Sequence, residues 1–287
     1  MSSIATMFRL VKFEHTVFAL PFAYAGMVLA TDASTGASVT ASLVLWITAA
    51  MVGARTFAMA VNRLVDAGID ARNPRTAMRD IPSGAITPMR VLLLSIAALV
   101  LLIAATFQLH PITRVLWPIP VALFVLYPYT KRFTWMCHFI LGVSIGLAPL
   151  GAWLAVTGTP SATAWFLVGA ITTWIGGFDI IYATQDVQVD REQGLCSIPA
   201  RFGVATALRI TRGSHVITAG CLIAAGLLAD LGIAYWATLV VVCGLLAWEN
   251  AIVRPSDLSR VNAAFFTING VLGIVYLGGV IGAVLLG

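Results

Sequence analysis

Long apolar segments, each ended by a short polar one, follow one another along the whole chain. A helix that crosses the hydrocarbon of a bilayer needs about 20 mostly apolar residues. We count nine such segments and expect each to form a helix, because lipid cannot satisfy unpaired backbone groups. The predicted spans are 15–31, 40–62, 89–108, 112–130, 138–157, 163–183, 214–230, 233–252 and 265–286. The pattern therefore predicts an all-α, polytopic membrane protein with nine transmembrane helices around a central cavity.

The composition excludes the other broad classes of protein. Hydrophobic residues make up 60% of the chain and charged residues 10%, with a mean hydropathy of +0.95. A soluble domain carries about 25% charged residues. Soluble globular, disordered and disulfide-scaffold proteins are therefore excluded. Because a membrane bundle is counted in spans, we expect residues 1–287 to form a single transmembrane domain.

The basic residues predict the orientation in the membrane. All of the 17 Lys and Arg residues except Arg114 lie at or near the same set of span ends. Cytoplasmic loops carry the excess of Lys and Arg, so this end, together with the N-terminus, is predicted to be cytoplasmic. The net charge of +5 follows from this bias, and we expect contact with membrane lipid and none with nucleic acid. The expected location is a bacterial or archaeal cytoplasmic membrane.

A first acidic cluster follows the second predicted span. Asn62, Asp66 and Asp70 are spaced four residues apart. Four residues are slightly more than one helical turn, so these side chains form one polar stripe on a helix. Charged groups beside a span are costly and commonly mark a functional site.

A second cluster follows the sixth predicted span. Asp179 and Asp186 are seven residues apart, about two helical turns, and Asp190 lies one turn further. Two acidic stripes repel unless a cation lies between them, and they favour a central cavity lined by the second and sixth spans. Ligand sets made only of oxygen favour Mg²⁺ or Mn²⁺ over zinc.

Basic residues near both stripes predict a phosphorylated ligand. Tyr127 and Lys131 lie four residues apart at the cytoplasmic end of the fourth span. Carboxylates that hold a metal, surrounded by Arg and Lys, suit a diphosphate. The basic residues that follow the two stripes are Arg72, Arg75, Arg79, Arg191 and Arg201. His138 begins a span, and we interpret it as an interfacial packing residue.

These residues resemble the UbiA superfamily of intramembrane prenyltransferases. The first stripe resembles that family's first Asp-rich motif, and residues 177–190 resemble the second. The segment from Tyr127 to Lys131 resembles the family's Tyr-x-x-x-Lys segment. One departure is Arg63, where many relatives carry an acidic residue. The resemblance covers nearly the whole chain.

The resemblance implies a polyprenyl diphosphate donor and an aromatic acid acceptor. Two Mg²⁺ ions, or Mn²⁺, would be held by Asn62, Asp66, Asp70, Asp186 and Asp190. The implied catalytic residues are Asp66, Asp70, Asp179, Asp186 and Asp190. Asp179 would orient or deprotonate the acceptor, or else pair with an Arg. The implied substrate-binding residues are Asn62, Arg72, Arg75, Tyr127, Lys131, Lys12 and Arg201.

The acceptor is left open between two compounds. Residues 133–135, 145–153 and 197–203 resemble the 4-hydroxybenzoate polyprenyltransferases and also the relatives that prenylate a dihydroxynaphthoate in the futalosine route to menaquinone. A CDP-alcohol phosphotransferase is a weaker alternative, because its longer Asp pattern is not found around residues 66–80. An ion-coupled transporter is another, but it would place its charges at the bilayer midplane.

Overall fold

The computed structural model describes residues 16–32 and 37–286. Within these residues all regular structure is helical, and an isolated bridge between Arg254 and Asp257 is the only extended pairing. This confirms the predicted all-α class. The α-helices are α2 (Thr16–Asp32), α3 (Ala41–Ala71), α4 (Pro88–Thr106), α5 (Thr113–Leu116), α6 (Pro118–Thr130), α7 (Cys137–Thr157), α8 (Ala162–Ala183), α9 (Val187–Glu192), α10 (Ile198–Phe202), α11 (Val204–Leu228), α12 (Ile233–Ile252) and α13 (Asn269–Leu286). A 3₁₀-helix, η2 (Thr184–Asp186), joins α8 to α9, and a π-helix, η3 (Ala263–Ile268), precedes α13.

Seven helical segments in the described residues are long and apolar enough to cross a membrane. They include all of the predicted spans except the first and the fourth, with α8, η2 and α9 counted together as Ala162–Glu192. The first predicted span corresponds to α2, whose described part has 17 residues. The described residues therefore contain seven, and not nine, helical segments that are long and apolar enough to cross a membrane.

The prediction of one continuous helix over 112–130 is wrong. The segment divides at Trp117 into the four-residue α5 and the 13-residue α6. Proline has no N–H with which to continue a helical ladder, but it is tolerated in the first turn. Pro118 accordingly begins α6. Hydropathy alone does not detect this division, because the residues on both sides of it are apolar.

The seventh span begins ten residues before its predicted start. Helix α11 starts at Val204, and Arg209 and Arg212 are exposed residues of its first turns and not loop residues. A window of apolar residues finds the part of a helix that lies in hydrocarbon, whereas the helix itself continues into the polar region.

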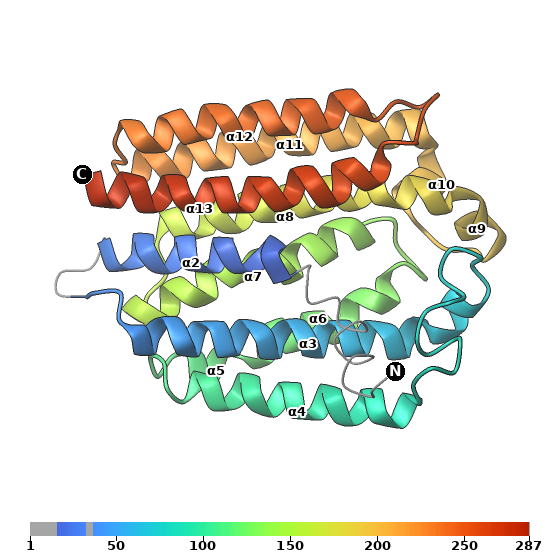
Figure 1. Cartoon of the computed structure of the whole chain (residues 1–287), viewed down its shortest axis with the longest axis horizontal. Helices are drawn as coiled ribbons and strands as arrows, with labels where there is room; N and C mark the ends of the chain where they lie inside the picture. The colour runs from blue at the N-terminus through green and yellow to red at the C-terminus, as the bar shows by residue number, and fades with distance from the viewer. Residues whose placement is uncertain (1–15, 33–36, 287) are drawn as a thin grey trace.

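The acidic stripes meet at one end of the bundle. In Figure 1, α3 runs toward the end at which α9 and α10 lie, so the C-terminal ends of α3 and α8 are on the same side. Helix α8 forms the centre of the core, and its Trp174 is among the largest fully buried side chains. A Cβ added to Gly142 of α7 would lie 2.3 Å from the backbone oxygen of Thr172. Glycine thus permits α7 and α8 to pack closely, which brings the side chains at their ends together.

Candidate active site

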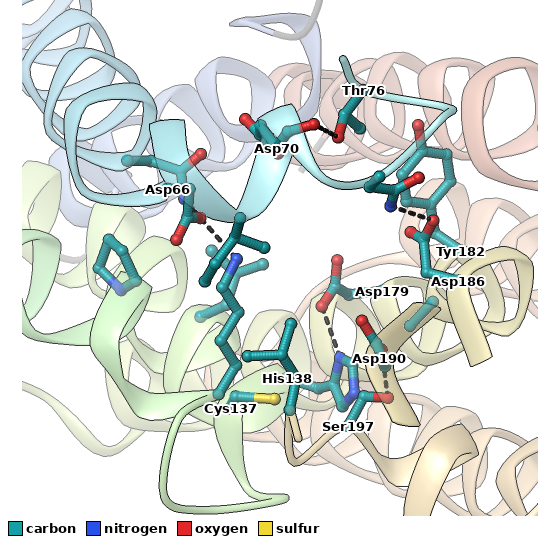
Figure 2. Close-up of a pocket in the computed structure, with 18 of the residues that line it drawn as sticks. Asp66, Asp70, Thr76, Cys137, His138, Asp179, Tyr182, Asp186, Asp190 and Ser197 are labelled. Carbon is teal, nitrogen blue, oxygen red and sulfur yellow. Dashed lines mark hydrogen bonds and ion pairs between the residues drawn. The ribbon is translucent and has the colours of Figure 1, made fainter. Parts of the chain in front are cut away.

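A cavity of about 250 Å³ lies among α3, α6, α7, α8 and α9 at this end of the bundle. Figure 2 shows carboxylates from α3 and carboxylates from the α8–α9 segment facing the same space. All five predicted catalytic residues line it, namely Asp66, Asp70, Asp179, Asp186 and Asp190. The predicted substrate-binding residues Asn62, Arg75, Tyr127 and Lys131 line it as well.

Asp66 is the most deeply buried of the α3 carboxylates, at 2% exposure. Its Oδ2 accepts hydrogen bonds from Asn62 Nδ2 at 2.9 Å and from Lys131 Nζ at 2.6 Å. Arg132 Nη2 lies 3.6 Å from Oδ1, which has no hydrogen-bond partner among the described residues. Because α3 stays helical to Ala71, Asn62 and Asp66 remain on one face, as the spacing predicts.

Asp70 is held by basic residues from its own part of the chain. Arg79 Nη1 donates to both of its oxygens, at 2.7 and 2.8 Å. Arg63 Nη1 lies 4.0 Å from Oδ2, so the residue that departs from the family pattern contributes a further positive charge here. Thr76 Oγ1 donates to the Asp70 backbone oxygen at 3.0 Å and fixes the loop that carries Arg79.

The second stripe does not lie on one regular helix. Helix α8 ends at Ala183, and η2 carries the chain to Asp186 before α9 begins. Asp186 accepts from Asn73 Nδ2 at 2.9 Å and from Arg75 Nε at 2.8 Å, and Arg75 Nη2 donates to its other oxygen. This bidentate pair joins the loop after α3 to the end of α8, and such pairs are among the stronger polar contacts.

Arg75 also contacts Tyr182 of α8. Its Nη1 donates to the Tyr182 hydroxyl at 2.8 Å, and the guanidinium carbon lies 4.9 Å from the ring centre. Burial alone would lower the pKa of the Arg75 guanidinium, but the bonds to Asp186 and Tyr182 outweigh burial and raise it. Arg75 is therefore a permanent positive charge at the cavity.

The two remaining carboxylates have neutral or weakly basic partners. Asp190 accepts from Ser197 Oγ at 2.6 Å. Asp179 Oδ2 lies 2.6 Å from His138 Nδ1. The interpretation of His138 as an interfacial packing residue is wrong, because its side chain is buried, lines the cavity and bonds a predicted catalytic residue.

Two predicted binding residues lie away from the cavity. Arg72 is exposed, and its Nε donates to the Gly68 backbone oxygen at 3.2 Å. Arg201 is exposed beside the Phe202 ring. Neither lines the cavity, and Lys12 lies outside the described residues.

Some cavity residues were not among the predicted site residues, chiefly Asn73, Thr76, Arg79, His138 and Ser197. Arg79 had a signal, since it is one of the basic residues that follow the first stripe. Ser197 lies in a segment that carries the family resemblance. For His138, the signal is only its place at the start of a span next to the second stripe.

The chemistry of the cavity fits a hard divalent cation. The donors are carboxylate and amide oxygens, which Mg²⁺ prefers, and Asp66 Oδ1 is a buried oxygen to which no described residue donates a hydrogen bond. In the described part of the chain, no group of three or more Asp, Glu, His or Cys side chains is arranged so that it could hold a metal ion without moving. Basic side chains hold Asp66, Asp70 and Asp186, so a metal would bind as Lys and Arg partners move away.

A larger apolar cavity of about 490 Å³ adjoins the polar one. Tyr127 and Leu141 line both. Most of the other residues around the apolar cavity are apolar, with Thr106, Thr113 and Ser144 as small polar exceptions. Arg55 is the charged exception in the described lining, and its Nε is buried with no hydrogen-bond partner among the described residues.

Comparison with known proteins places the chain in a family. Residues 19–271 match the family described as the UbiA prenyltransferase family. The chain belongs to the UbiA prenyltransferase family. The predicted resemblance and the predicted enzyme class, a prenyltransferase of the EC 2.5.1 type, are confirmed. Together with the seven apolar helices, this membership confirms an integral membrane protein.

Similarity to individual proteins supports this family assignment. The mitochondrial 4-hydroxybenzoate polyprenyltransferase of Arabidopsis thaliana is 35% identical over 201 residues, which are 69% of this chain and 48% of the relative. The chain thus spans about half the length of that relative. The 4-hydroxybenzoate solanesyltransferase of Synechocystis is 30% identical, over 77% of this chain and 76% of its own. A UbiA homologue from Aeropyrum pernix K1 superposes with a TM-score of 0.85 at 30% identity, covering 94% of this chain and 98% of that one.

Proposed function

We propose that the protein transfers a polyprenyl group from polyprenyl diphosphate to an aromatic acid, with Mg²⁺, in quinone biosynthesis. The observation that carries the proposal is the contact between the two cavities at Tyr127 and Leu141. A polyprenyl diphosphate has the same division, with a charged head and a long apolar tail. The excess of Lys and Arg at this end of the bundle supports a site open to the cytoplasm.

The polar cavity binds the diphosphate head. Asn62, Asp66 and Asp70 would hold one Mg²⁺, and Asp186 and Asp190 a second, with Mn²⁺ as a substitute. When bound, Mg²⁺ stabilises negative charge on the leaving diphosphate. The basic residues that now pair with the carboxylates, Arg75, Arg79 and Lys131, then bond the diphosphate oxygens.

The apolar cavity receives the tail and excludes water. Ionisation of the donor breaks the bond between carbon 1 and the diphosphate oxygen, and an allylic cation remains. The rings of Tyr127 and Tyr182 line the cavity where this charge forms, and an aromatic face stabilises a cation. Exclusion of water protects the cation from hydrolysis.

Arg55 and Asp179 suit the two polar groups of the acceptor. Arg55 Nε, which has no hydrogen-bond partner in the described part of the chain, can bond the carboxylate of an aromatic acid. Asp179, on the polar side, can bond its hydroxyl. A ring carbon next to the hydroxyl bonds carbon 1 of the prenyl group, and the proton that this ring carbon loses passes to the Asp179 carboxylate.

A product assay tests the function. Purified protein in nanodiscs receives Mg²⁺, a polyprenyl diphosphate, and either 4-hydroxybenzoate or a dihydroxynaphthoate, and mass spectrometry identifies the product. The names of the curated relatives favour 4-hydroxybenzoate. Product that disappears with EDTA and returns with Mg²⁺ supports the proposal. Absence of product with both acceptors, in protein that binds the donor, overturns it.

The acid group is tested separately with Arg55→Met. We expect the wild type to prefer 4-hydroxybenzoate over its amide, and this preference to be lost in the variant. An unchanged preference would remove Arg55 from the acceptor site while leaving the reaction class standing.

A further inference from the structure

His138 is a buried side chain that contacts two parts of the cavity wall. Its side chain is 4% exposed. On one side its Nδ1 lies 2.6 Å from Asp179 Oδ2, and on the other the backbone N–H of Ile198 donates to its Nε2 at 3.3 Å. Since Nε2 accepts a hydrogen bond, it carries no proton, and Nδ1–H is the donor to Asp179.

Asp179 differs from three of the four carboxylates assigned to the metal, while the fourth, Asp190, bonds Ser197. Asp66, Asp70 and Asp186 each pair with a Lys or Arg. Within the described residues, His138 is the partner whose bond to the Asp179 carboxylate is observed. In Figure 2, one Asp179 oxygen faces His138 and the other points into the open middle of the cavity. With one oxygen held, the other is presented in a fixed direction.

The Ile198 contact connects this pair to the metal side of the cavity. Ile198 begins α10, and the residue before it, Ser197, donates to Asp190. The segment 197–198 therefore bonds Asp190 through a side chain and His138 through a backbone N–H. Through these bonds, His138 fixes the position of Asp179 relative to Asp190.

We infer that His138 is a positioning residue that holds Asp179 for the aromatic acceptor. Its Nδ1–H fixes Asp179 Oδ2, so that Oδ1 accepts a hydrogen bond from the acceptor hydroxyl and lies beside the ring carbon that loses its proton. His138 itself touches neither substrate. This inference rests on the proposed function, because it assigns a role within the same reaction.

Two substitutions separate the hydrogen bond from the packing. His138→Leu keeps a branched side chain of similar size but has no donor. His138→Gln keeps an amide N–H₂ that can donate to Asp179 and an oxygen that can accept from Ile198 N. We expect His138→Leu to lower kcat/KM for the acceptor about 30-fold and His138→Gln to restore it to within about fivefold of the wild type. In both variants KM for the polyprenyl diphosphate stays within about twofold, because the metal and diphosphate residues are intact.

A double-mutant cycle shows whether His138 acts through Asp179. Asp179→Asn alone is expected to lower kcat/KM for the acceptor at least as much as His138→Leu. If His138 acts through Asp179, adding His138→Leu to Asp179→Asn lowers it less than about twofold further. If the two losses multiply, the inference is overturned.

The remaining outcomes are also decisive. Wild-type acceptor kinetics in His138→Leu, or a loss confined to donor binding, overturns the inference. If His138→Leu does not fold, His138→Met, which also lacks a donor, replaces it in the cycle. A wild-type protein that makes no product contradicts the proposed function, whereas an active wild type with an additive cycle contradicts only the role of His138.

Discussion

Two clusters of hydrogen-bonded polar side chains lie in the described bundle, and they are built differently. The cavity cluster consists of Asp66, Asp70 and Asp186 with their partners Lys131, Arg79 and Arg75. The sealed cluster consists of Trp174, His215, Glu249, Asn250 and Asn269. The cavity cluster lines open space, whereas no member of the sealed cluster lines either cavity.

The sealed cluster joins four helices, α8, α11, α12 and α13. Asn269 Nδ2 donates to Glu249 Oε1 at 2.9 Å, and Trp174 Nε1 donates to Asn269 Oδ1 at 2.7 Å. Asn269 also donates to the backbone oxygens of Ala264 and Phe265, at 3.0 and 3.2 Å, which lie in the π-helix η3. The two backbone oxygens cannot move away from Asn269, because they belong to the helix itself. Glu249 and Asn269 are completely buried.

The two clusters differ in whether their side chains can change partners. Lys and Arg have long side chains that can leave a carboxylate for a ligand, so the cavity cluster can exchange partners. Asn and Trp in a packed interior cannot do so. We therefore expect substitutions in the cavity cluster to lower activity without lowering stability, and substitutions in the sealed cluster to do the reverse.

Asp66→Asn is expected to have the largest effect. The loss of one carboxylate from the metal site should lower kcat about a thousandfold, equivalent to about 4 kcal/mol of transition-state stabilisation. The free energy of unfolding should change by about 1 kcal/mol or less, because the Lys131 and Arg132 side chains are 27% and 33% exposed and reach water. Product formation and denaturant unfolding in detergent measure the two quantities. A variant that is inactive because it is unfolded would contradict the comparison.

Asn269→Leu tests the other side of the comparison. The substitution leaves Trp174 Nε1 and Glu249 Oε1 buried without their partner, and we expect a loss of about 3 kcal/mol in the free energy of unfolding. The kcat of the folded fraction should stay within about twofold of the wild type. Asn262→Leu is the matched control, because Asn262 is exposed and lies near the same π-helix. An Asn269→Leu protein of wild-type stability would show that the sealed cluster does not hold the helices together.

Arg79→Met removes one basic partner from the cavity cluster. Because Arg79 bonds both oxygens of Asp70 and is assigned to the diphosphate, we expect KM for the donor to rise about 30-fold while kcat changes less. Initial rates at varied donor concentration measure this. A loss confined to kcat would place Arg79 at the transition state and not in donor binding.

Periodicity and hydropathy were sufficient to predict much of this arrangement. The four-residue spacing of Asn62, Asp66 and Asp70 placed them on one face because α3 remains helical through all three. The second stripe also reached the cavity, although η2 interrupts the helix after Ala183, since a short 3₁₀ turn changes the direction of a side chain less than a loop does.

Contacts between distant segments could not be predicted in this way. His138 and Asp179 are 41 residues apart on two helices, and the close packing of these helices, which Gly142 permits, brings them together. The segment from 72 to 87 has no regular period, so nothing in its spacing distinguishes Arg79, which bonds Asp70, from the exposed Arg72. The lining of the apolar cavity could not be predicted either, because hydropathy does not distinguish apolar side chains that pack against one another from those that line a cavity.

Arg72→Met is expected to have the smallest effect and is the sharpest control for Arg79. Both residues are arginines in the loop that follows α3, but Arg72 bonds only the Gly68 backbone oxygen in the described structure and does not line the cavity. We expect KM for the donor to change less than about twofold, because an exposed charge outside the cavity is screened by water and salt. Assayed at the same ionic strength, the two variants should differ by about tenfold or more. Equal losses in Arg72→Met and Arg79→Met would mean that the total positive charge of the loop attracts the diphosphate, and that the position of Arg79 at the cavity does not decide its binding.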